Sequence, residues 1–130
     1  MKRRLDDRFI PAAAIVPATV AKPGGVDHRP VDAKIDTGAD LCAVPESLVQ
    51  DLDLQPFRSV RAAGFNGVMG ELPVFRIEIR LDGMRFSDVE AVMTRRPYLI
   101  VGRNVLQHLV LRYDGPRGVM EIRDPRAKPR

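Results

Sequence analysis

The chain has 130 residues, which fits one domain with a modest core, and its 45% apolar content places it among soluble globular proteins. The single cysteine, Cys42, excludes an internal disulfide and a cysteine-based zinc site, so we expect a reducing compartment, the cytoplasm, rather than export. The net charge of +4 raises nucleic-acid binding as a candidate, but the arginines are spread singly along the chain and tryptophan is absent, so nucleic acid is not the partner we expect.

Charged residues open the chain. Residues 1–8 form a charged N-terminal segment that we expect to be mobile unless a partner binds it. Residues 9–20 read as an extended segment, and its two internal prolines, which cannot donate ladder hydrogen bonds, predict an edge strand or a bulged one. A turn rich in Pro and Gly follows, and a second strand over 30–35 is predicted to end directly before Asp36.

A glycine-rich stretch occupies the middle of the chain. Before it, residues 41–44 predict a short apolar strand, and residues 45–52, opened by a proline, predict one or two helical turns. Residues 62–70 include three glycines within the seven positions 64–70, which suits a hairpin flap that opens and closes. The residues expected in this flap are Gly64, Phe65, Asn66, Gly67, Val68, Met69 and Gly70.

Alternation of apolar and polar residues predicts a long hairpin after the flap. Residues 73–81 and 84–93 are its strands, and Asp82 and Gly83 are a strong signal for a two-residue turn. The residues predicted to share the solvent-facing side of the first strand are Arg76, Glu78 and Arg80.

The C-terminal part begins with a continuous apolar run. Residues 98–101 predict a strand that is buried on both faces, and residues 103–109 predict a short helix. A last hairpin is expected over 110–113 and 119–123, and residues 125–130 are expected to form a tail. No transmembrane span is expected, because no stretch approaches about 20 apolar residues.

Two segments carry the chemistry. Residues 35–40 read Ile-Asp-Thr-Gly-Ala-Asp, which places the Asp36 carboxylate on the sharp turn that leaves a strand. Residues 98–104 read Tyr-Leu-Ile-Val-Gly-Arg-Asn, an apolar run followed by Gly-Arg-Asn, where the predicted short helix begins. With the glycine-rich stretch between them, these segments resemble the retropepsin family of aspartic proteases. The resemblance covers about residues 30–123.

The resemblance implies an all-β, closed or partly open barrel-like domain over residues 9–124, with one short C-terminal helix and activity as a C2 homodimer. In that family each chain contributes one Asp-Thr-Gly to a shared site. A twofold axis would bring Asp36 beside its own copy, and peptide hydrolysis by carboxylates alone needs two of them, one to accept a proton and one to donate. The resemblance implies that Asp36 is catalytic, that Thr37 interlocks across the dimer, and that Arg103 pairs with Asp40.

Small residues complete the predicted loop. Gly38 allows close approach of a substrate backbone or a neighbouring loop, and Ala39 is small for the same reason.

Lys34, two residues before Asp36, occupies a place that is usually apolar in the family, so it indicates either an acidic or polar substrate residue or a lysine that faces outward. Cys42 is interpreted as a small buried residue rather than a nucleophile.

The predicted function is therefore an aspartic endopeptidase that cleaves a peptide or protein bound as an extended strand. No metal or organic cofactor is implied. Two other readings stay open: Asp36 is an ordinary turn aspartate, or the chain is an inactive retropepsin-like dimerisation or peptide-binding module.

Overall fold

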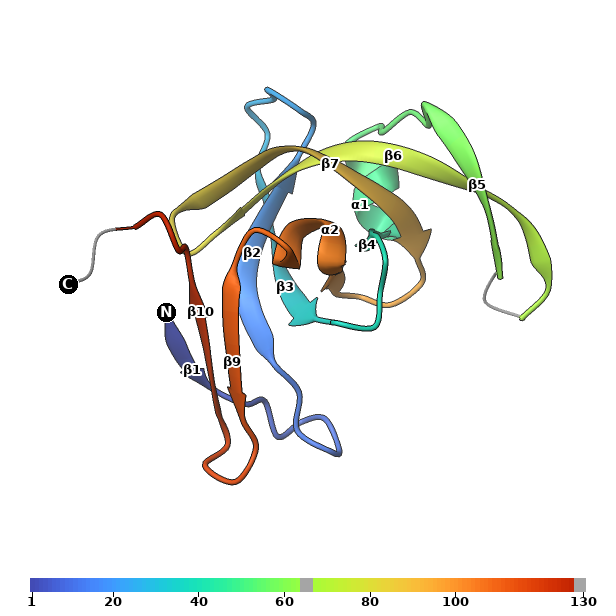
Figure 1. Cartoon of the computed structure of the whole chain (residues 1–130). Helices are drawn as coiled ribbons and strands as arrows, with labels where there is room; N and C mark the ends of the chain where they lie inside the picture. Colours follow the sequence, from blue (N-terminus) through green and yellow to red (C-terminus); the bar gives the residue numbers. More distant parts are fainter. Residues whose placement is uncertain (64–66, 128–130) are drawn as a thin grey trace.

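The structure is a computed structural model, and it describes residues 1–63 and 67–127. Strands dominate these residues, and the helices are short (Figure 1). The strands are β1 (Lys2–Arg4), β2 (Ile15–Ala21), β3 (Arg29–Ile35), β4 (Cys42–Pro45), β5 (Arg58–Ala63), β6 (Met69–Leu81), β7 (Met84–Thr94), β8 (Leu99–Val101), β9 (Val110–Asp114) and β10 (Val119–Arg123), and the helices are α1 (Glu46–Asp51) and α2 (Arg103–Leu106).

A closed barrel forms the body of the molecule. Its strands follow the order β2-β3-β8-β4-β7-β6-β5, and β2 also pairs with β6, which closes the sheet on itself. Alternate side chains of these strands point inward, so Val16 and Val20 of β2 meet Ile77 and Ile79 of β6 in one core. The predicted closed all-β domain is confirmed.

Strand β2 is neither the edge strand nor the bulged strand that its prolines predicted. It pairs with β3 along Ile15 to Val20 and with β6 from Thr19 to Ala21. The pairing with β6 begins only after Pro17, so the N–H that proline lacks is not needed in that ladder. The strand also begins later than predicted, since residues 9–14 lie outside it.

The long hairpin of β6 and β7 has the predicted turn. Asp82 and Gly83 both adopt positive φ, 49° and 73°, as a two-residue hairpin turn with the right-handed twist requires. Around this turn Leu81 pairs with Met84. The first half of β6, before its pairing with β7, pairs instead with β5, and this β5–β6 hairpin reaches beyond the barrel (Figure 1).

Glu78 does not lie on a solvated face as the alternation predicted, because it is 1% exposed. The register of β6 against β7 shifts between Ile77 and Ile79, and β2 covers the displaced position through its pairing with β6. Burial raises the pKa of the Glu78 carboxyl, but a hydrogen bond from Arg85 at 3.0 Å and the charges of Arg85, Arg80 and His28 together lower it overall.

A second, three-stranded sheet joins the two ends of the chain (Figure 1), in the order β1-β10-β9. Residues 1–8 were expected to be mobile unless a partner binds them, and β10 of the same chain is such a partner: Lys2 to Arg4 pair with Val119 to Glu121. This partner lies more than a hundred residues away, so local sequence did not indicate it. Met120 and Ile122 of β10 are buried and attach this sheet to the common core.

Helix α2 is shorter than predicted. It ends at Leu106, and residues 107–109 form a turn that leads into β9. Helix α1 begins directly after Pro45 and buries Leu48 against the core. Neither of these helices in the described part of the chain is long and apolar enough to cross a membrane.

Candidate active site

Asp36 stands where two parallel strands end together. Strand β3 pairs with β8 in parallel, with Ile35 opposite Val101, and the Asp36 N–H donates to the Val101 carbonyl at 3.0 Å. Strand β3 ends at Ile35, directly before Asp36, and lies between the largely buried strands β2 and β8. The Asp36 side chain therefore lies at the end of a well-packed strand. It is half-buried, while Thr37 and Gly38 after it are exposed.

The loop orients one oxygen of the Asp36 carboxylate. The Gly38 N–H donates to Asp36 Oδ1 at 2.9 Å, and the Ala39 N–H reaches the Asp36 carbonyl at 3.3 Å. A Cβ added at Gly38 would lie 3.2 Å from the same Oδ1, so this position favours glycine. The other oxygen, Oδ2, accepts no hydrogen bond from the residues that the structure describes, which leaves it available to a water or a second carboxyl group.

Arg103 fastens the loop to the segment behind it. Its Nη1 donates to the Thr37 carbonyl at 2.7 Å, its Nη2 pairs with Asp40 Oδ1, and its backbone N–H donates to the Ala39 carbonyl at 2.8 Å. The planar guanidinium therefore contacts both ends of the loop at once. All six residues predicted for the loop lie together: Asp36, Thr37, Gly38, Ala39, Asp40 and Arg103.

Gly102 is needed for a reason that the sequence did not show. A Cβ at this position would lie 2.5 Å from the Leu41 carbonyl oxygen and 3.0 Å from that of Ala39. Its φ is −90°, an ordinary value, so space rather than dihedral freedom requires glycine here. The absence of a side chain lets the Asp36 loop pack directly on the start of α2.

Asn104 is a supporting residue to which sequence reasoning assigned no role. Its Oδ1 accepts from the Cys42 N–H at 3.0 Å, and its Nδ2 donates to the Glu90 carbonyl at 2.8 Å. One planar amide thus joins the start of β4 to β7 behind the loop. Its place in the Gly-Arg-Asn segment was the available signal, because an amide beside Arg103 supplies both a donor and an acceptor.

Cys42 is buried, as interpreted, and its Sγ receives the Gly102 N–H at 3.4 Å. Burial raises the pKa of the Cys42 thiol to about 11, although the hydrogen bond from Gly102 opposes the rise. Such a thiol stays protonated near neutral pH and serves packing. Among the described residues, no group of three or more His, Cys, Asp or Glu side chains is placed to hold a metal ion.

The predicted flap lies at the tip of the β5–β6 hairpin, and the structure describes part of it. Gly64, Phe65 and Asn66 lie outside the described residues. Gly67 adopts φ of 75°, and Val68 and Met69 after it are 64% and 55% exposed. Met69 therefore lies outside the core and belongs to the surface of the hairpin.

Lys34 is half-buried rather than directed into solvent. Its Nζ lies 5.2 Å from the centre of the Phe9 ring and 5.7 Å from that of Tyr98, and the two rings meet edge to face. Cation–π attraction of this kind holds the ammonium group between the rings. The chain itself thus supplies the partners of Lys34, which stands where the family usually has an apolar residue.

Comparison of the chain with known protein families and solved structures agrees with this geometry. The aspartyl protease family model matches residues 16–114, a span that holds the Asp36 loop, Arg103 and the β5–β6 hairpin. The chain belongs to the aspartyl protease family. No curated protein matches this aspartyl protease in sequence.

Solved structures agree on the fold. A retropepsin-like aspartic protease from Rickettsia conorii aligns with a TM-score of 0.59 at 14% identity, over 95% of this chain and 90% of that one. The simian foamy virus (mac) protease aligns with a TM-score of 0.57 at 16% identity, over 72% of this chain and 92% of that one. The foamy viral protease-reverse transcriptase aligns at 0.56 and 15%, over 73% of this chain and 12% of that one. At these identities the likeness shows a retropepsin-like fold.

Proposed function

We propose that this aspartyl protease is an endopeptidase whose active site forms between two copies of the chain. Each copy contributes Asp36, so that two carboxyl groups face each other across a twofold axis. The observation that carries the proposal is the Asp36 loop: Gly38 orients one carboxylate oxygen, Arg103 fastens the loop at Thr37 and Asp40, and the second oxygen is left available.

The proposed reaction is general acid–base hydrolysis. Two carboxyl groups held close together share one proton, so one is ionised while the other is protonated. The ionised Asp36 accepts a proton from a water molecule as that water attacks the peptide carbonyl, and the protonated Asp36 donates to the carbonyl oxygen. Activity is therefore expected to peak at mildly acidic pH, where the singly protonated pair is most populated.

The substrate in this proposal is an extended peptide. It binds as an added strand through backbone hydrogen bonds, and its alternate side chains enter pockets on either side. The β5–β6 hairpin closes over it, and the exposed Val68 and Met69 supply apolar contact near the tip. The site stays within reach of solvent until the hairpin closes.

Cleavage of a mixed peptide library between pH 4 and 7 tests the proposal. Asp36→Asn preserves the shape of the side chain and removes its ionisation, so no cleavage is expected from it. Asp53→Asn is the matched control, because Asp53 lies in an exposed turn with φ of 50°, which asparagine also tolerates, and this variant should cleave as the unchanged protein does. Sedimentation of all three proteins shows whether they are dimers.

Mixing the two kinds of chain tests the shared site. When equal amounts of unchanged and Asp36→Asn chains exchange subunits, half of the unchanged chains enter mixed dimers, so activity per unchanged chain should fall to about half. If activity per unchanged chain stayed the same when the variant was added, a shared site would be contradicted. If neither the unchanged protein nor Asp36→Asn cleaves while both dimerise, the inactive peptide-binding module becomes the better account.

A further inference from the structure

The outward face of the three-stranded sheet carries a concentration of positive charge. In the register of β1, β10 and β9, Lys2 pairs with Glu121 and Glu121 with Arg112, so these three side chains share one face in a row. The neighbouring rows on this face are Arg4, Val119 and Asp114 on one side and Arg123 and Val110 on the other. Between them along β10, Met120 and Ile122 point the other way into the core. We call this surface the basic face; it consists of Lys2, Arg4, Val110, Arg112, Asp114, Val119, Glu121, Arg123 and, from the β9–β10 turn, Arg117.

Five cations and two carboxylates lie on the basic face, an excess of three positive charges, compared with a net charge of +4 for the whole chain. The arginines that the sequence spreads singly are thus gathered by the folding of the two ends into one sheet. A surface with this excess attracts an anionic partner and speeds its encounter with the protein.

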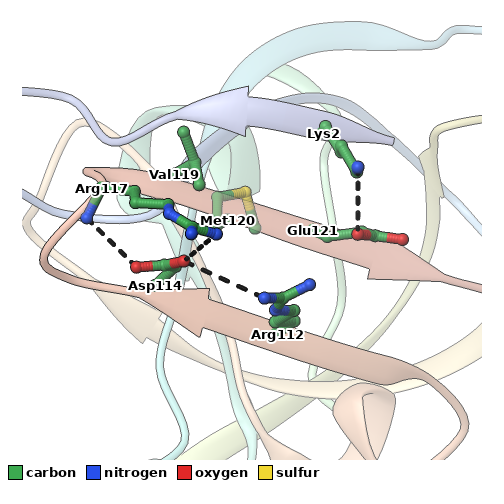
Figure 2. A pocket seen from close by; sticks show the side chains of 7 residues that line it. All are labelled: Lys2, Arg112, Asp114, Arg117, Val119, Met120 and Glu121. Atoms are coloured by element: carbon green, nitrogen blue, oxygen red, sulfur yellow. Dashed lines mark hydrogen bonds and ion pairs between the residues drawn. The ribbon is translucent and has the colours of Figure 1, made fainter.

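The ion pairs within the basic face are loose. Asp114 Oδ2 lies 3.7 Å from Arg117 Nη1 and 4.0 Å from Arg112 Nη2, and Glu121 Oε2 lies 4.0 Å from Lys2 Nζ. Dashed lines mark these pairs in Figure 2. These cationic side chains are 67% to 78% exposed, so each pair contributes little and the cations are available to other carboxylates. Arg4 and Arg123 are exposed and make no ion pair with any residue in the described ranges.

Two hollows lie on the basic face, one on each side of the row formed by Arg112 and Glu121. The first, of about 110 Å³, is lined by Lys2, Arg117 and Val119 among others (Figure 2). The second, of about 200 Å³, is lined by Val110 and Arg123 together with the same Arg112 and Glu121. Alternate residues of a strand recur at about 6.5 to 7 Å, so an extended chain laid along β10 would present alternate side chains on either side of the row formed by Arg112 and Glu121.

We propose that the basic face binds an acidic polypeptide segment in extended conformation, with carboxylates at alternate positions that pair with Arg4, Arg112 and Arg123. The two carboxylates of the face favour this occupant over a nucleic acid. Asp114 and Glu121 interrupt the cations, and a phosphate chain with a charge on every unit would meet both of them. The face also offers no aromatic ring on which bases could stack.

This binding does not depend on hydrolysis. None of the residues of the basic face belongs to the Asp36 loop or to the β5–β6 hairpin. The basic face is therefore a docking surface for an acidic segment, separate from the place where a peptide would be cut.

Fluorescence anisotropy tests the proposal with a labelled decapeptide of alternating Glu and Ala, added to the full chain carrying Asp36→Asn so that the probe is not cleaved. Two variants with the same change in net charge are compared. Arg4→Glu with Arg123→Glu alters the basic face, and Lys22→Glu with Arg96→Glu alters exposed cations of the β2–β3 turn and of the segment between β7 and β8. The altered residues are all exposed, and circular dichroism confirms that both variants fold.

The basic-face variant should bind the peptide about tenfold more weakly, the other variant within about twofold of the parent, and binding should weaken as salt rises. A decapeptide of alternating Gln and Ala should not bind. Equal losses in the two variants would show that only net charge matters and would overturn the proposal. A single-stranded oligonucleotide of the same charge that binds more tightly than the peptide, with the same loss in the basic-face variant, would overturn it in favour of a nucleic acid.

Discussion

Gly102→Ala should damage the loop that carries Asp36 without touching Asp36 itself. The added methyl group would lie 2.5 Å from the Leu41 carbonyl oxygen, whereas ordinary contact begins near 3.4 Å, so the backbone there must retreat by about 0.9 Å. The obstructing atoms belong to the main chain, which no rotamer change can move. The Arg103 N–H bond to the Ala39 carbonyl lies in the path of that movement.

Overpacking of this kind costs about 1–3 kcal/mol, and weakening the adjacent backbone hydrogen bond adds about 1 kcal/mol. We expect the free energy of unfolding to fall by about 3 kcal/mol, which for a chain of this length lowers the melting temperature by about 10 °C. Urea unfolding and calorimetry measure both quantities.

Gly70→Ala is the matched control. A Cβ at Gly70 would meet no atom within 4 Å, so the free energy of unfolding should change by less than about 0.5 kcal/mol. If Gly102→Ala lowered the free energy of unfolding by less than about 1 kcal/mol, or by no more than Gly70→Ala does, the contact between the loop and the start of α2 would not be rigid. Gly102 would then have no packing role.

Other residues support separate tests. The pKa of the Glu78 carboxyl lies below its ordinary 4.5 in the folded protein, so its contribution to stability is present above that value and is lost as pH falls through the folded pKa; Glu78→Gln should lower the melting temperature at pH 7 and flatten its decline in acid. At pH 8 only about one Cys42 in a thousand is a thiolate if its pKa is about 11, so Ellman's reagent should label the native protein at least about a hundredfold more slowly than the unfolded one; equal rates would show that the thiol is accessible. Arg103→Lys replaces a planar fork with a single ammonium group that cannot reach both Thr37 and Asp40, so urea unfolding should show a loss of about 1 kcal/mol; unchanged stability would contradict the fastening role.

Local rules account for what the sequence determined. Residues 35–40 place Asp36 after a strand because an apolar run ends in Asp-Thr-Gly, and the structure has β3 ending at Ile35. Asp82 and Gly83 make the hairpin turn because both tolerate positive φ. Helix α1 starts directly after Pro45, because proline is tolerated at the start of a helix but not in its interior. Each of these outcomes depends on a few neighbouring residues.

Long-range partners decided the rest. Alternation assigned Glu78 to solvent, and only the shift in register and the covering strand β2 bury it. Lys2 to Arg4 read as a mobile charged end, and only their pairing with β10 makes them a strand. The same pairing gathers scattered arginines onto one face. The physical reason is that strand pairing, register and burial depend on residues many positions apart, whereas turn and capping preferences act within a few residues.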